Sequence, residues 1–252
     1  MSQPITDEPI DAPTSRTRAT AVSSRSGRVV FFVGGGLFIL AGIVAILQTP
    51  LTPVFEWAYQ WGGDAYSVYG QVMQQSGRAL SAIAMIVFAV GTRGGGSVVA
   101  RKPLGMVALV VFAVWPYVVE LIWTLVPYES MAGLSWWAFA ALSLVPVAAG
   151  LIAVVEIVRV RAVPGPWQWL PALAYLVVIG SVVFGSIAQE LGWNNGEAYA
   201  PVVVVPYAIS LFAAFIAPLV LGIAAVALAL FAQRRQATVS AAESPAPIPP
   251  AP

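Results

Sequence analysis

The chain has 252 residues, of which 59% are hydrophobic and 9% are charged, and its net charge is +1. Average soluble proteins carry roughly 25% charged residues, so this composition excludes an ordinary soluble domain and indicates a chain embedded in a lipid bilayer. The chain contains no cysteine and no histidine. This excludes disulfides, thiolate nucleophiles, His-liganded haem and Ser–His catalysis.

Polar segments lie at both ends of the chain. Residues 1–27 are rich in Ser, Thr, Pro and Asp, and residues 237–252 are small and Pro-rich. Neither segment has an apolar periodicity, so we expect two disordered tails. Residues 28–236 are predicted to form one transmembrane domain.

Six apolar segments follow one another in that domain, at residues 29–47, 69–91, 104–125, 134–158, 167–187 and 203–232. A membrane-spanning helix needs about 20 residues, so each segment is long enough to cross. Residues 79–90 are too short to cross alone, and the second helix must therefore include the polar residues that precede them. Pro116, Pro146 and Pro218 lie within spans and are expected to kink them. The predicted fold is an all-α polytopic membrane protein with six transmembrane helices.

The basic residues set the predicted orientation. Of the 12 Lys and Arg residues, all except Arg78 fall on one side of the six predicted spans. Loops rich in Lys and Arg remain in the cytoplasm. The loops on the opposite side contain Glu56, Asp64, Glu129, Glu190 and Glu197. We therefore expect a multi-pass protein of the plasma (cytoplasmic) membrane with both termini in the cytoplasm.

The first apolar segment is predicted to be a retained span. It is longer than the core of a signal peptide, and no clear A-x-A cleavage site follows it. Its small residues Gly34, Gly35, Gly36, Ala41 and Ala45 allow close helix contacts. They indicate either a docking face for another subunit or packing within the bundle, and packing is favoured.

Glu120 lies inside the third segment, where an ionisable side chain is costly and usually faces the bundle or water. Tyr117 lies on the same helix face at i−3. At 1.5 Å per residue, Arg78 is about 20 Å from Gly91, and Glu120 is about 24 Å from Leu104, measured from the inner helix ends. Because these depths match, we predict an Arg78–Glu120 ion pair.

Further polar residues are predicted at this level. The second segment carries four of them at i, i+3, i+4 and i+7, on one helix face. The candidate intramembrane site comprises Arg78, Glu120, Gln71, Gln74, Gln75, Tyr117, Gln189 and Tyr207. These groups either form an outward-facing pocket for a ligand or satisfy one another, and the second interpretation is favoured. Near the inner surface, Glu156 is expected to pair with Arg159 at i+3.

No catalytic, metal-binding or cofactor-binding motif is recognisable, so we expect neither an enzyme nor a cofactor. The expected partners are the lipid bilayer and either other membrane subunits or further copies of the chain, with no nucleic acid. The favoured function is a structural or partner-binding subunit of a membrane complex. The alternative is a transporter or substrate-binding subunit with an outward-facing polar pocket around Arg78 and Glu120.

Overall fold

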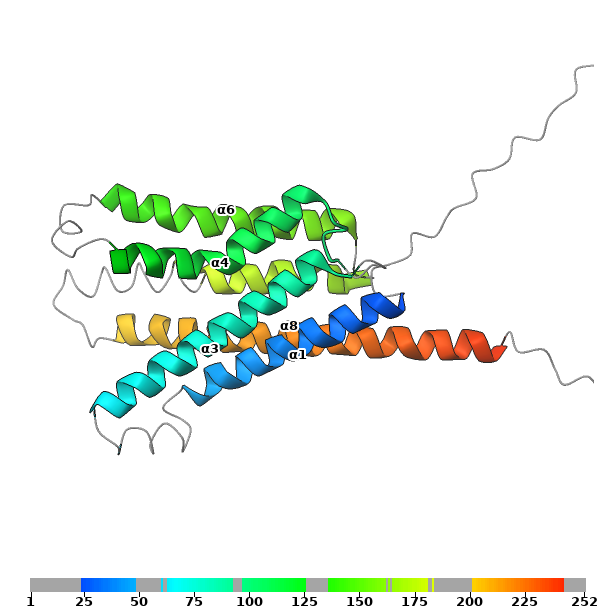
Figure 1. Cartoon of the computed structure of the whole chain (residues 1–252), viewed down its shortest axis with the longest axis horizontal. Helices are drawn as coiled ribbons and strands as arrows, with labels where there is room; N and C mark the ends of the chain where they lie inside the picture. The colour runs from blue at the N-terminus through cyan, green and yellow to red at the C-terminus, as the bar shows by residue number, and fades with distance from the viewer. Residues whose placement is uncertain are drawn as a thin grey trace, which may run out of the picture.

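The structure is a computed structural model that describes residues 24–48, 60, 63–92, 97–125, 136–161, 163, 165–180, 183 and 201–242. Its helices are α1 (Arg25–Leu47), α3 (Gly63–Val90), α4 (Pro103–Leu125), α6 (Trp136–Val160), the 3-10 helix η1 (Gly165–Trp169) and α8 (Pro201–Ala242). Residues 170–180 continue as a helix directly after η1. The long helices run side by side along one common direction (Figure 1).

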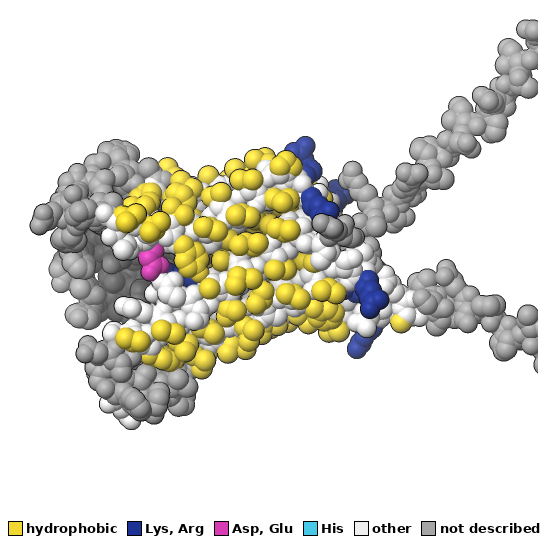
Figure 2. Space-filling model, in the orientation of Figure 1, with side chains coloured by type: hydrophobic (Ala, Val, Ile, Leu, Met, Phe, Trp, Pro, Cys, Tyr) yellow, Lys and Arg dark blue, Asp and Glu magenta, His cyan; other side chains and the backbone are white. Residues whose placement is uncertain are grey.

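The bundle has an apolar outer surface. Among the described residues, four helices are long and apolar enough to cross a membrane, at Arg25–Leu47, Pro103–Ile122, Leu142–Val160 and Phe215–Thr238. Large hydrophobic side chains such as Leu104, Leu144 and Ile223 point outward and are more than half exposed. They form a continuous apolar band around the visible face of the bundle (Figure 2). Since water-soluble proteins do not expose apolar patches of this size, the chain is an all-helical membrane protein.

α3 and the fifth predicted segment differ from these four helices. α3 begins at Gly63, before the predicted start near Tyr69, and its first half carries the glutamines and Arg78. These polar residues lower its hydropathy, which is why it is not among the four apolar helices. The fifth predicted segment is described as a helix over residues 165–180, and most of its remainder lies outside the described residues.

The ends of the bundle depart from the predicted tail boundaries. Ser24 caps α1, which begins at Arg25 rather than after residue 27. α8 continues to Ala242, six residues beyond the predicted end of the transmembrane domain at residue 236. No glycine or proline interrupts the chain between Arg235 and Ala242, and Pro245 is the first residue that cannot extend the helix. Residues 1–23 and 243–252 lie outside the described residues.

Three glycines bring α1 and α8 into direct backbone contact. A Cβ atom on Gly222 would lie 2.6 Å from the carbonyl oxygen of Gly35, and one on Gly35 would lie 2.9 Å from the carbonyl oxygen of Gly222. A Cβ on Gly42 would lie 2.3 Å from Leu219 Cγ. Small residues permit such close helix approach in membranes. We call Gly35, Gly42 and Gly222 the glycine seam.

The other small residues of α1 clarify what this helix packs against. A Cβ on Gly34 would lie 2.7 Å from the ring of Phe88 in α3, whereas Gly36 has no atom within 4 Å of a Cβ position. Ala41 is buried. For Gly34 and Gly35, the interpretation as packing within the bundle is therefore confirmed.

The turn between α3 and α4 closes one end of the bundle. Ser97 is buried, and its hydroxyl donates to the carbonyl of Ala89 at 2.7 Å. Val99 is fully buried behind it, and the Lys102 amide donates to the Val99 carbonyl at 3.0 Å. This folded turn holds the start of α4 against the end of α3, and so fixes the relative depth of the two helices that carry Arg78 and Glu120.

Candidate functional site

α3 and α4 together position a small group of polar side chains. Arg78 Nη1 lies 3.7 Å from Glu120 Oε2, so the predicted ion pair is formed. The side-chain amide of Gln75 donates to both carboxylate oxygens of Glu120, at 2.7 and 2.8 Å. Gln75 and Arg78 are neighbours at i and i+3 on α3, and Tyr117 and Glu120 have the same spacing on α4. We call these four residues the polar cluster.

The polar cluster is partly open. The side chains of Arg78 and Glu120 are 40% and 49% exposed, which is far more than an enclosed structural ion pair allows. Their 3.7 Å separation also exceeds the 2.7–3.2 Å of an ordinary N–H···O hydrogen bond. The Tyr117 hydroxyl, in contrast, is buried without a hydrogen-bond partner among the described residues. Buried hydroxyls normally have a partner, so this oxygen is an exception, and the protein atoms that cover it would have to move before another group could reach it.

Of the other four candidate residues, two are described and lie outside the cluster. Gln71 and Gln74 are exposed on α3, nearer its start than Gln75. Gln189 lies outside the described residues, and Tyr207 belongs to α8 but its side chain is not described. The structure therefore brings together Gln75, Arg78, Tyr117 and Glu120 from the eight predicted residues.

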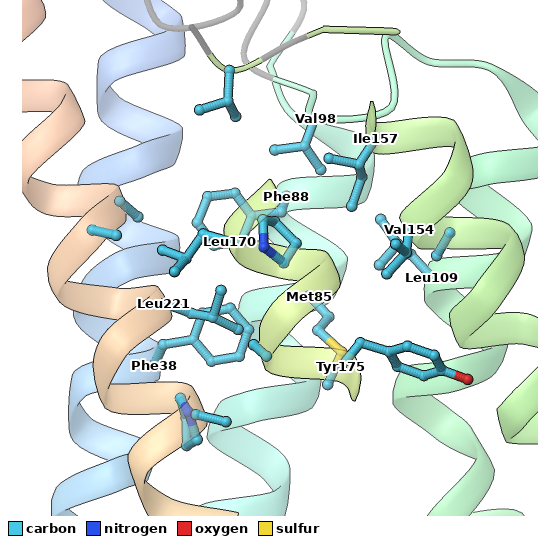
Figure 3. Close-up of a pocket in the computed structure, with 18 of the residues that line it drawn as sticks. Phe38, Met85, Phe88, Val98, Leu109, Val154, Ile157, Leu170, Tyr175 and Leu221 are labelled. Atoms are coloured by element: carbon cyan, nitrogen blue, oxygen red, sulfur yellow. The ribbon is translucent and has the colours of Figure 1, made fainter. Parts of the chain in front are cut away.

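A cavity of about 390 Å³ lies inside the bundle and was not predicted from the sequence. α1, α3, α4, α6, α8 and the helical segment after η1 all contribute to its walls. Its lining is almost wholly apolar and includes Phe38, Met85, Phe88, Leu109, Ile157 and Leu221 (Figure 3). No single segment of sequence reveals it, because each helix supplies only a few of these residues.

Tyr175 is one of the few polar residues in the cavity wall, and its hydroxyl is already bonded. It donates to the carbonyl of Val147 in α6 at 2.6 Å, while its ring packs edge-on against Phe112 of α4. Figure 3 shows the ring directed away from Phe38 and Leu221 on the opposite wall. The cavity surface therefore offers few hydrogen-bonding groups to a water molecule.

The polar cluster and the cavity share one face of α3. Arg78, Ser81, Met85 and Phe88 follow at intervals of three, four and three residues, and the last three line the cavity. Such spacing places all four side chains along one side of a helix. Ser81 is three residues from Arg78, slightly less than a full turn, and lies about 4.5 Å further along the axis. The cluster therefore lies about one helical turn beyond the end of the cavity wall.

α4 repeats this arrangement on the opposite side. Glu120, Tyr117, Ala113 and Leu109 follow at intervals of three, four and four residues, and Leu109 lines the cavity. Ala113 is buried between the two levels. On α4 the cavity residues nearest to Glu120 are Phe112 and Leu109, about 12 and 17 Å further along the helix axis. Both helices thus change from polar to apolar toward the same end of the bundle, although the change is more gradual on α4.

A second ion-pair group lies at the other end of the bundle. Glu156 of α6 is 7% exposed, with Arg159 Nη1 3.6 Å from one carboxylate oxygen and Lys102 Nζ 3.3 Å from the other. The predicted Arg159 contact is therefore present. The contact with Lys102 is an ion pair without hydrogen-bond geometry. It was missed because it depends on the turn between α3 and α4.

The chemistry of these residues points to binding. No group of three or more His, Cys, Asp and Glu residues that could hold a metal ion occurs in the described part of the chain. The polar cluster supplies one cation, one anion, an amide and a hydroxyl, and the adjoining cavity supplies apolar walls. Fold and site thus define an all-helical membrane protein with an internal apolar cavity. No protein-family model, curated protein or solved structure matches the chain.

Proposed function

We propose that the protein is a six-span membrane protein that binds a membrane-soluble molecule and holds an apolar part of that molecule in its cavity. The observation that carries this proposal is the cavity of about 390 Å³ with its almost wholly apolar lining. In the proposal the protein binds or carries this molecule without transforming it.

The size and lining of the cavity support an apolar occupant. A dry apolar cavity of about 150 Å³ binds benzene, and small-molecule sites span about 300–1,000 Å³. A buried water molecule needs two to four polar partners. The Tyr175 hydroxyl is already bonded to Val147, and Ser81 is the other hydroxyl in the described lining. A hydrocarbon group fits this surface better than water does.

This proposal is a form of the transporter or substrate-binding alternative, with the ligand held by apolar walls rather than by a polar pocket. The partner-binding subunit favoured by the sequence stays a prediction. One face that would support it, the small residues of α1, is partly occupied within the chain. Gly34 packs against α3 and Gly35 against α8, whereas Gly36 has no atom within 4 Å of its Cβ position. The cavity has no such internal occupant among the described side chains, which is why we favour ligand binding.

We propose six spans, with both termini on the cytoplasmic side of the plasma membrane. Most basic side chains visible in Figure 2 gather at one end of the apolar band, and an acidic side chain with a basic one beside it lies at the other end. Such asymmetry favours the basic end as the cytoplasmic one. Arg28 near the start of α1 bonds Gln236 near the end of α8, which supports placing both termini at one side.

The orientation is tested with single cysteines, which the chain accommodates because it has none of its own. In intact cells an impermeant maleimide is expected to label Gln71→Cys on the outer side. Thr238→Cys, on the opposite end, is expected to react only after the cells are permeabilised. Labelling of Thr238→Cys in intact cells would contradict the orientation.

The ligand is tested by filling the cavity. Ala153 is buried in the cavity wall, and Ala148 on the same helix faces outward. The protein is purified in a gentle detergent, and the small molecules that remain bound are measured by mass spectrometry. We expect one apolar molecule to be enriched with the wild type and with Ala148→Phe, and to be lost with Ala153→Phe. Equal retention by all three proteins would overturn the proposal.

A further inference from the structure

We infer that the polar cluster and the cavity form one site for an amphipathic lipid, with the headgroup at the cluster and a hydrocarbon chain in the cavity. The headgroup is zwitterionic, carrying a phosphate and a primary ammonium. This inference rests on the proposed function and specifies the class of its ligand.

The first observation that supports this inference is the position of the polar cluster and the cavity along the same helices. The faces of α3 and α4 that carry Arg78 and Glu120 continue into Ser81 and Leu109, which line the cavity. A ligand spanning both levels therefore meets charged groups at one end and apolar walls at the other. A wholly apolar molecule would use only the cavity, and a small polar solute would use only the cluster.

The charges of the cluster are the second support. Arg78 and Glu120 contribute one positive and one negative charge, held 3.7 Å apart and each about half exposed. An anionic headgroup would be repelled by Glu120, and a cationic headgroup by Arg78. A headgroup with one charge of each sign is attracted by both residues. Its phosphate pairs with the planar guanidinium of Arg78, and its ammonium pairs with the carboxylate of Glu120.

The free hydrogen-bonding capacity is the third support. The Glu120 oxygens accept from Gln75, but a carboxylate has about four acceptor positions, so two are left for an ammonium. A primary ammonium donates hydrogen bonds, whereas a quaternary one does not.

The test uses the full-length protein in detergent and native mass spectrometry with synthetic phospholipids of identical chains. Three headgroups are compared, namely phosphoethanolamine, phosphocholine and phosphoglycerol. We expect the phosphoethanolamine lipid to bind about ten-fold more tightly than the other two, as one charged hydrogen bond warrants. Glycerophosphoethanolamine, which lacks the chains, is expected not to compete.

Variants separate the headgroup from the chain. Glu120→Gln is expected to abolish the ten-fold preference, because it removes the partner of the ammonium. Arg78→Gln loses the contact with the phosphate that all three lipids share, so it is expected to weaken their binding alike. Arg235→Gln, which removes an exposed cation near the end of α8, is expected to change neither. The double variant Arg78→Gln/Glu120→Gln is uncharged at the cluster and serves if either single variant fails to fold. A preference that survives in the double variant would overturn the inference.

The two proposals fail in different ways. Equal binding of the three headgroups, still weakened by Ala153→Phe, would overturn the zwitterionic headgroup and leave the cavity as the binding site. Unchanged binding in Ala153→Phe relative to Ala148→Phe would overturn the proposed function as well.

Discussion

Glycine permits close packing in two regions, the glycine seam between α1 and α8 and the cavity wall at Gly150. The contacts that the two regions make differ in kind. At the seam, Gly222 meets the backbone of α1, and the oxygen of Gly35 lies 2.6 Å from its Cβ position. On the cavity side, a Cβ on Gly150 would meet Cε2 of the Tyr175 ring at 2.2 Å. A helix backbone cannot yield, whereas a ring beside a cavity can move. The seam is therefore a rigid contact, and the cavity side is adaptable.

The largest effect is expected from Gly222→Ala. The added methyl group meets the Gly35 oxygen and the Ile39 amide nitrogen, at 2.6 and 2.8 Å, so α1 and α8 must separate. We expect the free energy of unfolding to decrease by about 3 kcal/mol, which is at the upper end of the usual cost of overpacking a core. Thermal unfolding followed by size-exclusion chromatography in detergent measures it. An unchanged melting temperature would show that the two helices do not touch at this point.

A smaller loss is expected from Gly150→Ala. The Tyr175 ring can swing toward the cavity, at the expense of its 2.6 Å hydrogen bond to Val147. Losing one such bond costs about 1 kcal/mol, and we expect a decrease of about that size. In the Tyr175→Phe background the bond is already absent, so the same glycine substitution is expected to cost less. A loss as large as that of Gly222→Ala would remove the contrast between the two regions.

The smallest effect, and of opposite sign, is expected from Gly36→Ala. Gly36 lies next to Gly35 in α1, but no atom lies within 4 Å of its Cβ position. Alanine restricts the unfolded chain and favours helix, so we expect a gain of about 0.5–1 kcal/mol. The same thermal measurement compares it with Gly222→Ala. A destabilised Gly36→Ala would indicate a partner packed on this face of α1, as the subunit interpretation predicts.

The helices and the ion pair were predictable because they depend on local signals. Apolar length places both ends of α1, α4 and α6 to within four residues and the start of α8 to within two, but the end of α8 lies ten residues beyond its predicted position. A fixed rise per residue matches the depths of Arg78 and Glu120. Gln75 was identified by its place on the polar face of α3. These inferences require only the helix period and the bilayer thickness.

The cavity and the Lys102–Glu156 contact were not predictable in this way. Both depend on how helices distant in sequence pack, and on the turn that buries Val99. One local signal did exist, since Ser81, Met85 and Phe88 extend the polar face of α3 at helical spacing. A sequence alone does not show whether such a face meets another helix or a space.

The Lys102–Glu156 ion pair has a consequence for the order of events during synthesis. Lys102 leaves the ribosome well before Glu156, so the loop that follows α3 enters the membrane machinery with its positive charge unpaired. In the proposed orientation this loop is cytoplasmic, and Lys and Arg residues are the ones that retain a loop there. Only when α6 docks is that cation neutralised by a carboxylate. The same lysine can thus direct insertion of the growing chain and later fasten the finished bundle.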